Sequence, residues 1–136
     1  MACGQASDRF GDHAIACGSQ GERIASHNHL RDAVFHTAVS ASLGPTREDR
    51  ALLPGADQRP ADVLIPLWAG GHDAALDITV INPLQIQTVD RAARESGHAL
   101  DMRYRQKMNK YGELCAAEGI VFQPLNKAAR LHYRSV

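Results

Sequence analysis

Two aspartates occupy similar places in two neighbouring apolar segments. Asp62 directly precedes Val-Leu-Ile, and Asp77 lies within Leu-Asp-Ile-Thr-Val. If these segments form a hairpin centred between Ala69 and Gly70, Asp62 faces Asp77, with the two Cβ atoms about 5 Å apart. Two carboxylates at that distance repel each other unless a cation bridges them or one of them is protonated. Because Mg²⁺ is bound by one or two carboxylates together with waters and phosphate oxygens, the pair predicts a metal site.

The same pair has a second interpretation. Asp62 and Asp77 are also compatible with strand-end carboxylates that face water or cap turns, and a slip of one residue in the register would separate them. Aspartate is disfavoured within strands, so its occurrence in two adjacent strands needs a reason. Both interpretations stay open at this point.

A lysine lies on the apolar side of the helix expected after these strands. Lysine is rarely buried without a partner, and the aspartate pair would supply one. Alternatively, the aliphatic stem of Lys107 covers apolar surface while its ammonium group reaches water. Lys110 lies at the edge of the same stripe. At about 100° per residue, the stripe that contains Lys107 comprises Leu100, Tyr104, Met108, Tyr111, Leu114 and Cys115.

The first helical segment shows a similar irregularity. His27 and Arg31 fall within its apolar stripe, whereas His29 falls outside it. A single histidine on an apolar face is more often a satisfied core residue than a catalyst. His27 and Arg31 are therefore only weak candidates for a site.

The elements that would position these residues follow from the periodicity and from turn residues. Their order, α-β-β-β-α-β, predicts an α/β domain with a mixed sheet flanked by helices. Residues 1–21 are polar and glycine-rich, which predicts an irregular appendage before a domain over 22–136. Glycine and proline delimit the segments. We expect a helix over 22–43, a weak strand over 51–54, strands over 61–68 and 75–82, a helix over 88–118 interrupted at Gly97, a strand over 120–125 and a partial helix in the basic tail 126–136.

The composition narrows the class of protein. The chain has 136 residues, of which 44% are hydrophobic and 22% charged, as in one globular domain. No apolar run approaches the roughly 20 residues of a membrane span, and no signal peptide opens the chain. Three cysteines do not make a secreted disulfide framework, which favours an intracellular, reducing compartment. Aromatic residues amount to only 5%, which argues against a stacking platform for single-stranded nucleic acid.

The net charge of zero conceals an asymmetry between the two parts of the chain. Residues 1–90 contain 6 Lys/Arg and 11 Asp/Glu, whereas residues 91–136 contain 9 and 4. The acidic part is suited to bind a metal ion, and the basic part to face phosphates. Two ordinary solvated faces would give the same balance.

Taken together, the residues resemble the PD-(D/E)XK nuclease superfamily. An acidic residue after Arg-Pro-Ala, a second about 15 positions later, and a lysine on the next helix carry this likeness. Over residues 1–125 the chain is more specifically similar to the restriction-like endonuclease domain of site-specific non-LTR retrotransposons. That domain has a Cys/His cluster, a His-Asn segment, two acidic strands and a Lys-x-x-x-Tyr helix. The corresponding residues here are Cys3, His13 and Cys17, then His27 and Asn28, then Asp62 and Asp77, then Lys107 and Tyr111.

The resemblance implies Mg²⁺- or Mn²⁺-dependent hydrolysis of DNA phosphodiesters by a nuclear protein. Asp62 and Asp77 would hold the metal ion. Lys107, or its rival Lys110, would orient the attacking water, and Tyr111 would position the lysine or contact the phosphate. The usual lysine, two residues after the second acid, is replaced by Thr79. Contacts to the DNA backbone would come from Arg103, Arg105, Lys110, Lys127 and Arg130, together with Arg134.

The amino-terminal cluster departs from the family pattern. Cys3, His13 and Cys17 would bind Zn²⁺, but Met1 stands where the family pattern has a further cysteine. A fourth ligand would have to come from elsewhere, such as His29, or from water. If zinc binds there, the segment would position DNA rather than catalyse.

Two other classes of function remain compatible with the sequence. One is a catalytically inactive nuclease-fold domain that binds DNA or another protein. The other is a different small α/β domain in which Asp62 and Asp77 are structural. The sequence also leaves open whether a homodimer makes paired cuts.

Overall fold

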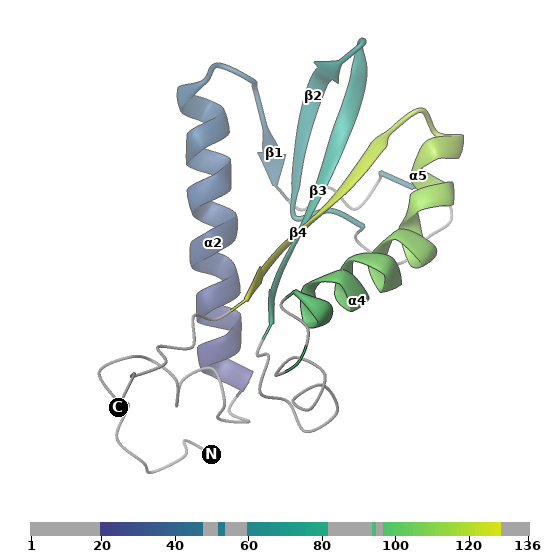
Figure 1. Ribbon diagram of the computed structural model, residues 1–136. Helices are drawn as coiled ribbons and strands as arrows, with labels where there is room; N and C mark the ends of the chain where they lie inside the picture. Colours follow the sequence, from purple (N-terminus) through teal and green to yellow (C-terminus); the bar gives the residue numbers. More distant parts are fainter. Residues whose placement is uncertain (1–19, 48–51, 54–59, 82–93, 95–96, 129–136) are drawn as a thin grey trace.

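The computed structural model describes residues 20–47, 52–53, 60–81, 94 and 97–128 (Figure 1). The amino-terminal appendage expected over 1–21 lies outside this part of the chain up to residue 19, and residues 20 and 21 already belong to the first helix. The elements are α2 (Gln20–Ser40), β1 (Thr46–Arg47), β2 (Val63–Ala69), β3 (His72–Ile81), α4 (His98–Lys107), the π-helical turn η1 (Met108–Gly112), α5 (Glu113–Ala117) and β4 (Val121–Ala128).

The strands form one mixed sheet in the order β1-β2-β3-β4. The first three strands are antiparallel, and β4 pairs in parallel with β3. Figure 1 shows α2 on one side of the sheet and the α4–α5 segment on the other. The predicted α/β class and the mixed sheet with flanking helices are thereby confirmed, and the described elements follow the order α-β-β-β-α-β with a first strand other than the one predicted. No helix of the described residues is long and apolar enough to cross a membrane.

Each face of the sheet packs against its own helix. Val63, Ile65 and Ile78 are buried towards α2, as the alternation in β2 and β3 predicts. On the opposite face, Tyr111 and Phe122 belong to a second cluster beneath the α4–α5 segment, which also includes Leu53, Ala61, Ala75 and Cys115. The central strand β3 therefore lies between two apolar layers, and a charged residue on it needs a partner from one of the helices.

Helix α2 ends in a Schellman motif. Ser42 adopts a left-handed conformation (φ 58°), its N–H donates to Val39 O, and Leu43 N–H donates to Ala38 O. The predicted stop at Gly44 is thus reached two residues early, because a serine takes the left-handed position that usually favours glycine.

The hairpin has the expected register where it matters for the site, but it is centred between Gly70 and Gly71 and not between Ala69 and Gly70. Leu64 pairs with Ala75 and Ile65 with Ala74, as predicted, whereas Ala69 pairs with His72, so Gly70 and Gly71 form the turn. A bulge in β2 between Ile65 and Ala69 reconciles the two registers. The shift amounts to two residues, so the residues before the bulge keep their faces.

The bulge changes the position of one predicted core residue. Alternation along β2 would place Leu67 on the face that carries Val63 and Ile65, but Leu67 is 74% exposed. Its backbone is left-handed (φ 51°), and its N–H donates to Oδ1 of Asp73. The prediction was wrong here because alternation along a strand fails across a bulge.

Three further boundaries differ from the expected ones. The strand predicted over 51–54 is absent at Leu52 and Leu53, which form a bend, and the first strand is the short polar pair Thr46–Arg47. Leu53 is buried without strand pairing. Strand β4 continues to Ala128, where a partial helix was expected from residue 126.

Helix α4 begins directly after Gly97, where an interruption was predicted, and α5 ends before Gly119, close to the predicted end at residue 118. Gly97 (φ 88°) precedes α4, and Gly119 (φ 72°) follows α5. The π-helical turn between α4 and α5 was not predicted. Residues 88–93 and the tail beyond 128 lie outside the described residues.

Strand β4 forms one edge of the sheet. Proline is tolerated in an edge strand where the N–H that it lacks would have pointed to solvent and not to a neighbouring strand. Pro124 fits this rule, and its carbonyl accepts a hydrogen bond from the Gln123 side chain at 3.1 Å. Both features hinder the addition of another strand at this edge.

Candidate active site

Asp77 and Lys107 form an ion pair between the central strand and the helix that follows it. Nζ of Lys107 lies 2.8 Å from Oδ2 of Asp77 and donates a hydrogen bond to Oδ1 at 3.0 Å. The exposed fractions of the two side chains are only 19% for Lys107 and 10% for Asp77. The lysine predicted on the apolar stripe of the helix is therefore largely buried and has a carboxylate partner.

The surroundings of Asp77 favour its neutral form. Burial raises the pKa of Asp77 above its ordinary value, whereas the hydrogen bond and the charge of Lys107 lower it. The negative charge of Asp62 also raises the pKa of Asp77, which shows that the two carboxylates interact. Loss of hydration outweighs the single cation, so Asp77 is poised to gain from a second positive charge.

Asp62 ends the pairing between β2 and β3. It directly precedes β2, and its N–H donates to Leu76 O at 2.9 Å. Its carboxylate turns towards β3, where Oδ2 accepts the N–H of Ile78 at 2.7 Å. The hairpin register predicted that Asp62 pairs with Asp77 in the ladder, and this prediction was wrong. The Asp62 side chain accepts the Ile78 N–H in place of a backbone carbonyl, so the ladder does not continue to Asp77.

His27 brings the first helix to the same carboxylate. Its Nε2 lies 3.2 Å from Oδ2 of Asp62, although 35 residues separate them. Sequence periodicity ranked His27 with Arg31 as a weak candidate, and the structure separates the two. Arg31 donates from Nε to Asp32 at 3.0 Å, and this hydrogen bond lowers the pKa of Asp32.

Tyr111 lies in the core beneath the helix. It is buried, and its ring packs edge-on against Phe122 with centroids 5.6 Å apart. Lys110, the rival of Lys107, is exposed, and its Nζ lies 4.8 Å from the centroid of the Tyr111 ring. Of the two lysines, Lys107 is the one paired with a predicted metal-binding carboxylate.

The cations expected to contact DNA are exposed where the structure describes them. Arg103 and Arg105 lie on α4, and Arg103 also contacts Gln106 at 3.2 Å. Lys127 lies near the end of β4. Arg130 and Arg134 lie outside the described residues.

The predicted zinc ligands Cys3, His13 and Cys17 likewise lie outside the described part of the chain. His29, suggested as a fourth ligand, is exposed on α2. Cys115 is buried, and burial raises the pKa of its thiol. Within the described residues, no group of three His, Cys, Asp or Glu side chains is arranged to hold a metal ion.

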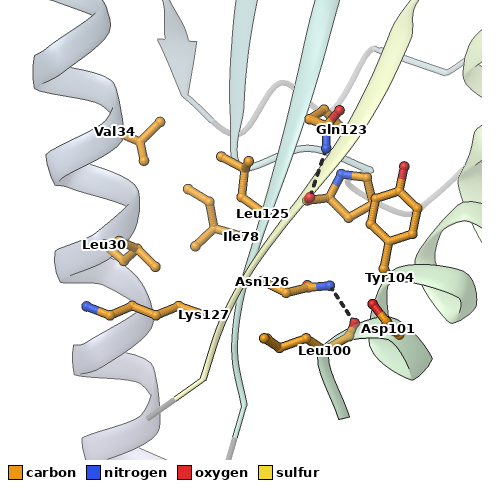
Figure 2. A pocket seen from close by; sticks show the side chains of 11 residues that line it. Leu30, Val34, Ile78, Leu100, Asp101, Tyr104, Gln123, Leu125, Asn126 and Lys127 are labelled. Atoms are coloured by element: carbon orange, nitrogen blue, oxygen red, sulfur yellow. Dashed lines mark hydrogen bonds between the residues drawn. The ribbon is translucent and has the colours of Figure 1, made fainter. Parts of the chain in front are cut away.

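A groove of about 470 Å³ lies along β4. Figure 2 shows Leu30 of α2 on one side of β4 and Tyr104 of α4 on the other. Ile78, whose N–H binds Asp62, and Pro124, the ladder partner of Asp77, both line it. The groove is thus lined by neighbours of the two carboxylates, whereas Asp62, Asp77 and Lys107 do not line it.

The site carries two features that sequence reasoning missed. The first is the hydrogen bond from the Ile78 N–H to Asp62. It leaves no signal in the sequence, because almost any residue supplies a backbone N–H. The contact of His27 with Asp62 depends on how α2 packs, and its only signal is a histidine on an apolar face.

In comparisons with known proteins, no family model, curated protein or solved structure matches this chain.

Proposed function

We propose that the chain is a Mg²⁺-dependent endodeoxyribonuclease of the PD-(D/E)XK type, which hydrolyses a phosphodiester bond and nicks DNA. The observation that carries this proposal is the contact between the buried carboxylate of Asp77 and Lys107, beside Asp62. Two acids and a lysine, contributed by adjacent strands and the next helix, are the set that the resemblance requires. The element order α-β-β-β-α-β agrees with it.

The donor atoms suit a small divalent cation. Oδ2 of Asp77 is buried and accepts no hydrogen bond within the described residues, although Nζ of Lys107 lies nearby. Oδ1 of Asp62 is likewise without a hydrogen bond from that part of the chain. Mg²⁺ needs only one or two protein carboxylates, because waters and phosphate oxygens complete its shell. When bound, the ion would polarise the scissile phosphate and favour ionisation of water.

Lys107 would act on the reacting groups once a cation shares Asp77. The carboxylate would then attract the ammonium group of Lys107 less strongly. The ammonium group would be able to orient the attacking water or neutralise developing negative charge. Tyr111 would position Lys107 by anchoring the π-helical turn against Phe122, since its burial disfavours direct contact with phosphate.

Exposed cations would bind the DNA backbone without reading its sequence. Arg103, Arg105 and Lys110 follow one another on the α4–η1 segment, and Lys127 lies on the edge strand. Such contacts make binding depend strongly on salt. We further propose that Cys3, His13 and Cys17 hold Zn²⁺ and that the protein acts in the nucleus, as the resemblance implies.

A nicking assay on supercoiled plasmid tests the proposal. Wild type should nick in Mg²⁺ or Mn²⁺, and Asp77→Asn and Lys107→Ala should each lose nicking. Asp101→Asn, an exposed carboxylate change on the same helix as Lys107, is the matched control and should keep it. Equal nicking by all four would indicate contamination or a misplaced site. Salt-sensitive DNA binding without nicking by folded wild type would instead support an inactive nuclease-fold domain.

A further inference from the structure

Within the described residues, the hydrogen bonds to the Asp62 side chain converge on one of its two carboxylate oxygens. Oδ2 accepts the Ile78 N–H at 2.7 Å and lies 3.2 Å from Nε2 of His27. Within the described residues, no donor reaches Oδ1. Within that part of the chain, the contacts thus engage the Oδ2 side of the carboxylate.

The two donors come from different elements and constrain the side chain together. The Ile78 N–H belongs to the central strand, whereas His27 reaches in from α2 on one face of the sheet. One hydrogen bond leaves a carboxylate free to rotate about the contact, and a second donor from another direction limits that rotation. The His27 ring is itself restrained by partial burial, since only 31% of its side chain is exposed.

We infer that His27 is a positioning residue, which holds Asp62 through Oδ2 and so presents Oδ1 to the metal ion. This inference rests on the proposed function, because it concerns the same metal site. His27 touches a metal ligand and not the substrate, so its contribution is to the geometry of the site. Partners of this kind that orient a ligand typically change metal affinity by about 10- to 100-fold when removed.

The distance of Nε2 from the backbone allows the inference to be tested by substitution. Glutamine carries an amide nitrogen at about the same distance along the side chain as Nε2 of histidine, whereas the amide of asparagine is one methylene group shorter. His27→Gln should therefore keep the hydrogen bond to Asp62, and His27→Asn and His27→Ala should lose it. His29→Ala, two residues further along the same helix and exposed, is the matched control.

Calorimetric titration of the full chain with Mn²⁺ measures the metal affinity of each variant directly. Thermal unfolding shows that each variant is folded. We expect His27→Ala and His27→Asn to weaken Mn²⁺ binding by about 10- to 100-fold. His27→Gln should stay within a few-fold of wild type, and His29→Ala should be unchanged.

The possible failures are distinguishable. Wild type that binds Mn²⁺, together with a His27→Ala variant that binds it equally well, would overturn the inference alone. The inference alone would also be overturned if His27→Gln binds Mn²⁺ no more tightly than His27→Asn does. Wild type that neither binds Mn²⁺ nor nicks DNA would overturn the proposed function and the inference with it.

Discussion

Asp77 and Lys107 lie 30 residues apart in the chain, yet Nζ of the lysine is within 3.0 Å of both carboxylate oxygens. The strand that carries Asp77 has a neighbouring strand on either side, and both side chains of the pair are largely buried. Burying a charge is unfavourable unless it is paired, and each residue is the partner that the other one needs. The contact therefore ties the helix to the sheet and keeps an acid and a base together in the candidate site.

The ion pair should be visible as a coupling in stability. Lys107→Met removes the partner of a buried carboxylate, and we expect it to lower the free energy of unfolding by about 1–3 kcal/mol. The double variant Asp77→Asn/Lys107→Met should lose less than the sum of the two single changes, because no charge is then left buried. Urea denaturation of the four proteins measures this coupling. Strictly additive changes would mean that the pair contributes no mutual stabilisation.

The pH dependence of stability should carry the signature of Asp77. Burial raises the pKa of Asp77 in the folded state above the 3.8 of an ordinary aspartate. Its contribution to stability is therefore fully present below pH 3.8 and is lost as the pH rises through the folded-state pKa. Asp77→Asn removes this titration, so the variant should gain stability relative to wild type as the pH rises through that window. Denaturation curves for both proteins across the window test it, and a constant difference would contradict it.

The sequence predicted the contact of Lys107 with an aspartate of the pair better than it predicted the elements around it. Lys107 was identifiable because a helical face with a regular apolar stripe makes a single lysine conspicuous, and such periodicity is set locally. The pairing of Leu64 with Ala75 followed from the hairpin in the same way. By contrast, β1 consists of the exposed pair Thr46–Arg47, which has no hydrophobic pattern to find.

The features that were missed depend on contacts between distant segments. Asp62 was expected to face Asp77 directly, but it turns to meet the N–H of Ile78 and the ring of His27. Nothing near Asp62 in the sequence encodes the approach of α2. The bulge in β2 also went unpredicted, because the acceptor for the Leu67 N–H is a side chain on the partner strand.

The bulge itself gives a prediction about backbone strain. Leu67 is left-handed and largely exposed, so it bears a steric penalty while burying little apolar surface. Leu67→Gly should therefore raise the free energy of unfolding by about 0.5–1 kcal/mol, after allowance for the greater freedom of glycine in the unfolded chain. Asp73→Ala should lower it, because the Leu67 N–H loses its acceptor. Chemical denaturation measures both, and destabilisation by Leu67→Gly would show that the leucine side chain contributes packing.

Lys107 and a metal ion should compete for the same carboxylate. The ammonium group lies against both oxygens of Asp77, and a bound divalent cation would have to share or displace it. Removing the lysine also removes a positive charge that repels the ion. We therefore expect Lys107→Ala to bind Mn²⁺ several-fold more tightly than wild type while it loses nicking. Asn109→Ala, an exposed neighbour on the same segment, should change neither property appreciably. Calorimetric titration decides the point: weaker Mn²⁺ binding by Lys107→Ala would mean that the lysine supports the metal site and does not compete with it.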